Sequence, residues 1–160
     1  MTIMAKKLDR SAGSRPAPER ERAISSAGPR AVCILNQTRG TPLSAHTIVA
    51  HGFRARSRGL LDRHELCPGE GMLFDAALPL MWMHTLFMAF PIDIIFTDRS
   101  NVVIKIHHSL KPWRLSALVF GARKAIELAA GVAARAATEV GDQLSICQTH
   151  NSAETSSGNR

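Results

Sequence analysis

The sequence predicts a mainly β single domain, a β-sandwich or partly open barrel with one or two short helices and disordered termini. Three observations lead to this fold class. The chain has 160 residues, a length typical of one domain. Its central part alternates short segments rich in β-branched and aromatic residues with turn residues, as strands and their connections do. Both ends are polar and show no clear period, and no internal repeat is present.

Three segments of different composition divide the chain. Residues 1–30 are rich in Pro, Ser, Arg and Glu, and we expect a disordered basic extension there. Residues 31–148 hold the apolar segments and form the expected β domain. Residues 149–160 are mostly polar, so we expect a disordered C-terminal tail.

Strands are expected where short apolar segments lie between turn signals, namely over residues 32–35, 43–50, 72–74, 80–84, 92–97, 102–107, 114–120, 124–128 and 143–147. The first two should form a hairpin, because Gly40 can adopt a positive φ and Pro42 fixes the backbone after it. Residues 98–101 should form a β-turn that lets 102–107 pair back on the preceding strand.

The remaining segments predict turns and helices. Glycines at both ends of 69–71 indicate a turn, and a second turn is expected at 141–142. Residues 53–63 place apolar residues among arginines, which suits a short amphipathic helix or a turn. The alanine-rich residues 131–138 favour a helix.

The positive charge is concentrated at the N-terminus. The formal net charge is +7, of which residues 1–30 supply +4 from seven Lys/Arg against three Asp/Glu. Such a tail could bind nucleic acid weakly and without sequence preference, or acidic lipid. We expect it instead to be a solvated extension, and a protein partner for the domain stays open.

We expect a cytoplasmic protein. The N-terminal stretch has no apolar region of the kind that a secretory signal needs. The longest apolar segment, 76–96, is interrupted by Pro79, His84, Pro91 and Asp93, so it predicts buried core rather than a membrane span. The odd number of cysteines, three, favours reduced thiols.

Six short motifs occur in order between residues 31 and 147: RGLLDR at 58–63, GEGMLF at 69–74, MWMHT at 81–85 with FPIDIIF at 90–96, DRSNVVI at 98–104, AIELAAG at 125–131 and VGD at 140–142. Together they resemble the family known as domain of unknown function 192 (DUF192), small bacterial and archaeal proteins. The resemblance implies a mainly β fold, a sandwich or barrel with short helices. It implies no reaction, because the family's biochemical function is not established.

The chain departs from this family's pattern at three positions. Asp62 stands where the family usually has Gly, so the loop there can differ. Asn101 replaces the usual turn Gly, although Asn tolerates the left-handed conformation. Ala129 replaces the usual Pro, which loosens a turn and affects no chemistry.

His84 and Asp93 are the candidate catalytic residues. Each is a polar residue embedded in an apolar segment, where it needs a hydrogen-bond partner. If their strands pair, the carboxylate could orient the imidazole as a general base requires. We favour the alternative, in which His84 is a core histidine and Asp93 caps a turn or binds backbone amides, because no nucleophile is placed beside them.

Four further residues are candidates for ligand binding: Arg58, Arg63, Trp82 and Glu127. The two arginines could hold a phosphate or a carboxylate, and we favour instead a pairing with buried acids such as Asp93 or Glu127. Glu127 should point away from the face of its neighbours Ile126 and Leu128, toward solvent or the mouth of a cavity. Trp82 could line an apolar pocket, although core packing is its expected role and Trp113 is the better candidate for exposure.

No metal or cofactor site is expected. Adjacent His107 and His108 would face opposite sides of a strand, and the spacing of His46 and His51 does not suit a chelate. No phosphate-binding glycine loop or hydrolase motif is present.

Three functions follow as hypotheses. We favour a non-enzymatic binding or accessory module, because the polar motif residues look structural. The first alternative is an unassigned enzyme or small-ligand-binding domain that uses His84 and Asp93 with Arg58 and Arg63. The second is nucleic-acid binding, which the basic tail supports, as does a resemblance of residues 126–146 to the strand, short helix and Gly-Asp turn of swapped-hairpin transcription factors.

Overall fold

The computed structural model describes residues 30–50 and 65–148. Their elements are β1 (Ala31–Asn36), β2 (Thr41–Ala50), β3 (Gly69–Asp75), β4 (Leu80–Met81), β5 (Ile92–Thr97), β6 (Val103–Leu110), β7 (Val119–Phe120), β8 (Lys124–Ala129), α2 (Val132–Arg135) and β9 (Leu144–Gln148). The predicted basic extension, except Arg30, and the predicted C-terminal tail lie outside the described residues. So does the helix or turn expected over 53–63.

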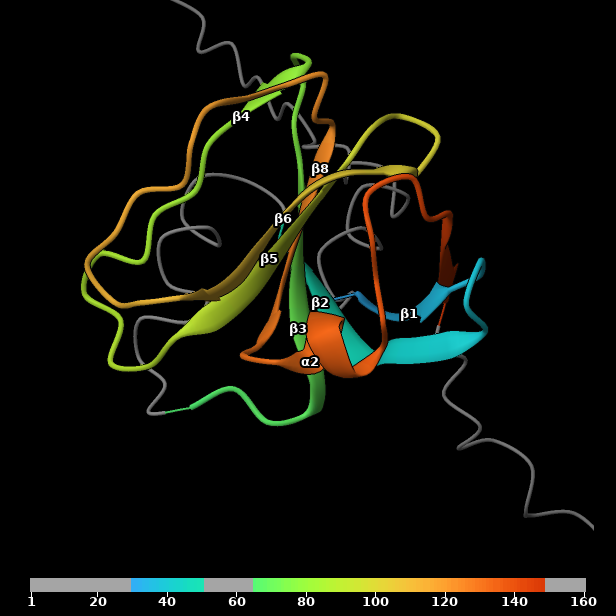
Figure 1. The fold of residues 1–160 in the computed structure, drawn as a ribbon, viewed down its shortest axis with the longest axis horizontal. Coiled ribbons are helices and arrows are strands. Elements are labelled where there is room, and N and C mark those ends of the chain that lie inside the picture. Colours follow the sequence, from blue (N-terminus) through green and yellow to red (C-terminus); the bar gives the residue numbers. More distant parts are fainter. Residues whose placement is uncertain (1–29, 51–64, 149–160) are drawn as a thin grey trace, which may run out of the picture.

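Seven strands form one sheet that curls into a half-barrel (Figure 1). Their order is β6-β5-β8-β3-β2-β1-β9, and all neighbours are antiparallel except the parallel pair β2 and β3. An isolated bridge between Val102 and Gln143 links the chain next to β6 with the chain next to β9, the two edges of the sheet. The mainly β prediction is therefore confirmed, as are the hairpins of β1 with β2 and of β5 with β6.

The core is centred on β5 and β8, which lie side by side in the sheet. All six residues of β5 and five of the six in β8 are buried. A strand that is covered on both faces has a nearly continuous apolar sequence. The sequences of β5 and β8 follow this pattern. A polar side chain in either strand, such as Asp93 or Glu127, is consequently held inside the protein.

The predicted helix at 131–138 is reduced to the single turn of α2. Gly131 precedes it in the left-handed conformation, with φ 82°. Ala137 also has a positive φ, 50°, and the amide of Thr138 donates to the carbonyl of Ala133. These contacts close the helix early, so the high helix propensity of alanine is overridden by the tertiary fold.

The prediction of a turn at 69–71 is wrong, because these residues begin β3. They pair in parallel with β2, with Gly69 opposite Ser44 and Gly71 opposite Thr47. At Gly71 the sheet is very tight: a Cβ there would lie 3.0 Å from both the Glu127 carbonyl oxygen and the Thr47 Oγ1. The glycine therefore serves close packing between strands rather than chain reversal.

A separate two-stranded ribbon, β4 with β7, extends from the half-barrel. We refer to residues 76–91 and 111–123 together as the arm. Figure 1 shows the arm on the opposite side of the molecule from β1 and β9. The strands predicted over 80–84 and 114–120 are each only two residues long, because side chains interrupt the ladder: the amide of Met83 donates to Ser116 Oγ, 2.8 Å away.

Candidate functional site

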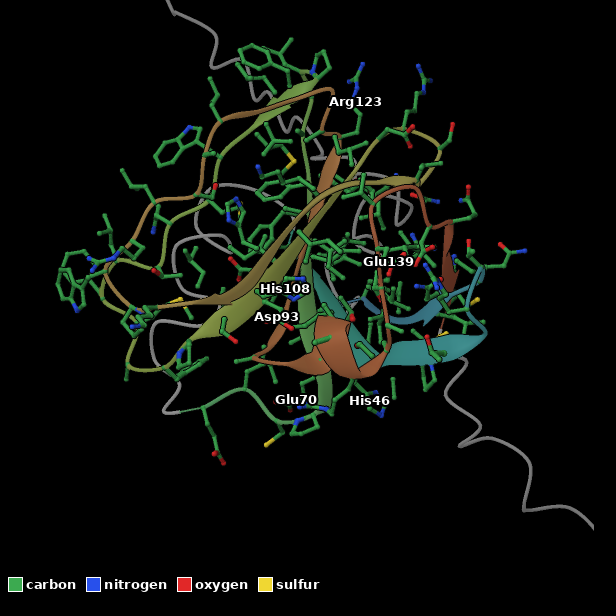
Figure 2. The ribbon with its side chains drawn as sticks, in the orientation of Figure 1. His46, Glu70, Asp93, His108, Arg123 and Glu139 are labelled. Atoms are coloured by element: carbon green, nitrogen blue, oxygen red, sulfur yellow. The ribbon has the colours of Figure 1, made fainter. Side chains whose placement is uncertain are left out.

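Asp93 is completely buried in β5, and both of its carboxylate oxygens accept hydrogen bonds from backbone amides. Oδ1 accepts from Ser109 at 2.8 Å and Oδ2 from Ala133 at 2.9 Å. Figure 2 shows Asp93 beside α2. The carboxylate thus joins β5 to the end of β6 and to the helix, which is the structural arrangement we favoured over a catalytic one.

His84 lies in the arm and is exposed, so the interpretation of His84 as a core histidine does not fit the structure. Its backbone forms an isolated bridge with Leu115, and its ring centroid lies 6.0 Å from that of Trp82. The hydrogen bonds of the Asp93 carboxylate go to β6 and α2 instead. The fold therefore does not bring the two candidate catalytic residues together.

Glu127 is 5% exposed at the centre of β8, with Met72 and Ile94 as its cross-strand partners. It does point away from the face of Ile126 and Leu128, but it is buried and is not among the residues that line the half-barrel cavity. Burial raises the pKa of its carboxyl group to about 8. Arg58 and Arg63, which we expected to pair with a buried acid, lie outside the described residues.

Trp82 and Trp113 both lie on the surface of the arm, at 55% and 56% exposure. The expected core packing of Trp82 is therefore wrong, whereas the exposure of Trp113 is confirmed. They belong to a larger set: of the ten exposed large apolar side chains among the described residues, eight are in the arm, namely Leu78, Leu80, Trp82, Phe87, Trp113, Leu115, Leu118 and Phe120. This concentration was missed in the sequence, where residues 76–96 were interpreted as buried core, residues 114–120 as a strand, and only Trp113 as a candidate for exposure.

The two faces of the arm differ because side chains alternate along a strand. Met81 pairs with Val119, and both are buried against the half-barrel. Leu80 pairs with Phe120, and both are exposed, at 40% and 75%. The arm thus buries one apolar face and presents a second one outward.

Thr85 holds the far part of the arm together. Its hydroxyl donates to the carbonyl of Lys111 at 2.7 Å and accepts from the amide of Arg114 at 3.0 Å. Beyond it, the rings of Phe87 and Trp113 meet edge to face, with centroids 4.7 Å apart. A fully buried threonine with this set of bonds makes the arm a defined surface.

The arm contains no Asp or Glu and carries Lys111, Arg114 and Arg123. The guanidinium of Arg123 donates to the carbonyl of Ala77 at 2.7 Å, and Figure 2 places this residue at the base of the arm, far from Asp93. The ion pairs found among the described residues are those of Arg39 with Glu139 and Asp142. Neither of these ion pairs involves a basic group of the arm. The absence of acids was a signal available in the sequence.

A cavity of about 310 Å³ opens at one end of the half-barrel. Its lining combines apolar and polar side chains: Arg30, Val32, Val49, Leu73, Asp75, Asn101, Lys124, Ile146 and Gln148. Asn101 has φ 65°, and its buried Oδ1 has no hydrogen-bond partner. A buried acceptor without a donor is a feature that a bound ligand or water can satisfy.

The three cysteines are free, and two of them face each other. Cys33 in β1 pairs directly with Cys147 in the edge strand β9. Burial raises the pKa of the Cys33 thiol, and a hydrogen bond with Cys147 raises it further. Cys147 is exposed, as Cys67 is, whereas Cys33 is half-buried.

Two kinds of feature are absent from the described residues. No group of three His, Cys, Asp or Glu residues within them is arranged to hold a metal ion. The same part of the chain contains no helix long and apolar enough to cross a membrane. The described residues do present an apolar and basic surface on the arm, a small cavity and a buried acid.

Known proteins resemble this chain in sequence over most of the described β domain. The model of the DUF192 family, described as "Uncharacterized ACR", matches residues 34–146. The chain belongs to the DUF192 family. A UPF0127 protein of Thermococcus sibiricus is 30% identical over 116 residues, covering 69% of this chain and 72% of that protein. A UPF0127 protein of Pyrococcus abyssi is 27% identical over 114 residues, covering 69% and 94%.

Two solved structures share the fold of this DUF192 protein. A candidate transcription regulator from Sinorhizobium meliloti matches with a TM-score of 0.64 at 24% identity, over 74% of this chain and 94% of that one. A protein of unknown function from Novosphingobium aromaticivorans matches with a TM-score of 0.60 at 21% identity, over 88% and 99%. At these identities the likeness extends to the fold alone, and no specific function is indicated.

Proposed function

We propose that this DUF192 protein is a non-enzymatic binding module and that the arm is its interaction surface. The observation that carries the proposal is the concentration of eight of the ten exposed large apolar side chains on the arm. Soluble domains rarely expose a contiguous apolar patch unless it meets a partner. We propose the cytoplasm as its compartment, because its described thiols are free.

The polar residues support binding rather than catalysis. Both oxygens of Asp93 accept hydrogen bonds from backbone amides inside the protein, and the described partners of this carboxylate include no histidine ring. His84 lies on the outward surface of the arm. Glu127 has a pKa raised by burial, but a raised pKa alone does not make a general acid.

Native purification of the full chain tests the proposal. The arm variant Leu80→Ser/Phe120→Ser removes outward apolar groups, and the control variant Leu35→Ser/Val140→Ser removes the two exposed apolar groups outside the arm. Proteins and lipids recovered with each are identified by mass spectrometry. We expect a component that the wild type and the control retain and the arm variant loses. Identical recovery with all three chains would contradict the proposal.

Small-ligand binding in the half-barrel cavity is a second candidate function. The observation that favours it is a cavity lined by the basic residues Arg30 and Lys124 together with the carboxylate of Asp75 and the amide group of Asn101. The basic groups suit the carboxylate of a small hydroxy or amino acid, and the polar groups suit its hydroxyl or amino group. A thermal-shift screen of hydroxy and amino acids, compared between wild type and Asn101→Gly, tests it. Stabilisation that Asn101→Gly leaves unchanged would argue against this cavity.

A further inference from the structure

We infer that the partner of the arm is the surface of an anionic lipid membrane, onto which the arm docks without spanning it. The inference rests on the proposed function, because it names the class of partner for the same surface. Two properties of the arm lead to it: the sign of its charge and the kind of side chains that it exposes.

Charge favours an anionic partner. The arm has no Asp or Glu, and its basic residues Lys111, Arg114 and Arg123 lie beside exposed apolar groups. Lys111 and Arg114 are themselves exposed. Basic residues next to an apolar face are typical of protein surfaces that bind anionic lipid headgroups while apolar groups enter the acyl boundary.

The apolar side chains favour lipid over nucleic acid. Four of the eight are leucines, namely Leu78, Leu80, Leu115 and Leu118. Leucine gains free energy in hydrocarbon but offers no ring on which a base can stack. Trp82 and Trp113 complement them, since the amphipathic indole ring is enriched at the boundary between headgroups and acyl chains.

Other segments of the same chain fit this surface less well. Residues 51–64 carry four arginines and one acid, and residues 1–29 carry six Lys/Arg against three acids, so both repeat the charge of the arm. A second copy of the arm would also place like charges together. Residues 149–160 contain no large apolar side chain to pack against the leucines.

Tryptophan fluorescence provides a direct test, because the chain has two tryptophans and both are on the arm. The full chain is titrated with vesicles of phosphatidylcholine alone and of phosphatidylcholine mixed with phosphatidylglycerol. We expect emission to shift to shorter wavelength with the anionic vesicles and co-sedimentation to follow the same curve. The basic N-terminal tail contains no Trp, so tail binding alone would give co-sedimentation without the shift.

Two variants separate the charge and apolar contributions. Lys111→Gln/Arg114→Gln should weaken partitioning roughly 10- to 30-fold, since each basic group near an anionic surface contributes about fivefold. The control variant Arg99→Gln/Lys105→Gln removes two exposed basic residues outside the arm. It should leave partitioning onto the vesicles unchanged. Leu80→Ser/Phe120→Ser should abolish the fluorescence shift, whereas Leu35→Ser/Val140→Ser should keep it.

Several results would overturn the inference. Absence of an emission shift with anionic vesicles, or equal partitioning of the arm and control variants, excludes the membrane as the partner. A dimer in sedimentation velocity that Phe120→Ser dissolves would assign the arm to a second copy, and quenching by single-stranded DNA would assign it to nucleic acid. Either of these two outcomes would still be consistent with the arm as an interaction surface. If the native purification also finds no arm-dependent component, the proposed function fails as well.

Discussion

The Oδ2 atom of Asp93 lies 2.9 Å from the backbone nitrogen of Ala133, and this hydrogen bond joins the central strand β5 to helix α2. Asp93→Asn should lower the free energy of unfolding by about 1–3 kcal/mol, because the amide group turns one acceptor into a donor that faces an N–H. Urea denaturation at neutral pH measures the loss.

A carboxylate in a turn provides the comparison for Asp93. Oδ1 of Asp98 accepts from the amides of Ser100 and Val102, but Asp98 is not fully buried. Asp98→Asn should therefore cost less, because water can replace a lost partner. Equal losses for the two variants would show that the burial of Asp93 contributes nothing.

Glu127 should make the protein less stable as the pH rises. Its pKa is raised from 4.5 to about 8 by burial, so the folded state holds a proton that the unfolded state releases. The stability present below pH 4.5 should be lost progressively up to pH 8, by on the order of 3–5 kcal/mol. Glu127→Gln removes this dependence and should be the more stable chain at pH 8.

Paired unfolding curves isolate the effect of Glu127. Other carboxyl groups titrate in both chains, so the quantity to follow is the difference in unfolding free energy between the wild type and Glu127→Gln from pH 4.5 to 9. That difference should grow with pH. A constant difference would show that the carboxyl group titrates normally.

Gly71 should not tolerate a side chain. Gly71→Ala would place a Cβ 3.0 Å from the Glu127 carbonyl oxygen and 3.1 Å from Leu128 Cδ2, where two strands leave no room. We expect a loss of about 1–3 kcal/mol in thermal or urea unfolding. Gly69→Ala is the control, because nothing lies within 4 Å of that Cβ and its cost comes from φ +92° alone.

Oxidised glutathione should convert Cys33 and Cys147 into a disulfide. The thiolate of one attacks glutathione disulfide and releases one glutathione; the second cysteine thiolate then displaces the other glutathione, so two thiols are oxidised and one glutathione disulfide is reduced. Residues opposite each other in a sheet are near disulfide distance, and β9 is an edge strand that can adjust. The thiolate is the attacking species, and burial raises the pKa of the Cys33 thiol, so little Cys33 thiolate is present at neutral pH. The reaction should therefore become faster as the pH rises.

Thiol titration and intact mass follow this oxidation. Cys67→Ser should form the same disulfide, and Cys147→Ser should form none within the chain. The product should resist urea better than the reduced protein, by a few kcal/mol, because the closed loop is long. Accumulation of two stable mixed disulfides with glutathione would show that β1 and β9 hold the sulfur atoms apart.

The strands of the core could be predicted because their signals are local. Ile92–Thr97 and Lys124–Ala129 are short apolar runs bounded by turns, and their length favours strands over helices. The alternation rule also assigned the correct face to Glu127. It could not tell whether that face is covered, since coverage depends on segments distant in the sequence.

The arm shows the opposite case. Residues 80–84 are as apolar as the core strands, so Trp82 and His84 read as buried. Their partner is a single short strand, and one face of the ribbon meets the half-barrel while the other meets nothing that the structure describes. Whether an apolar strand is exposed depends on which other elements pack against its faces. The local sequence pattern of the strand does not contain this information.

The sequence by itself determined the mainly β class, the positions of the principal strands and the membership of the DUF192 family, because these depend on short-range periodicity and on the order of motifs. The tertiary structure alone decided which polar residues share a site. It separated His84 from Asp93, placed Cys33 opposite Cys147 and gathered the exposed apolar residues on the arm. The physical reason is that strand order and register, which set these neighbours, arise from packing between distant segments.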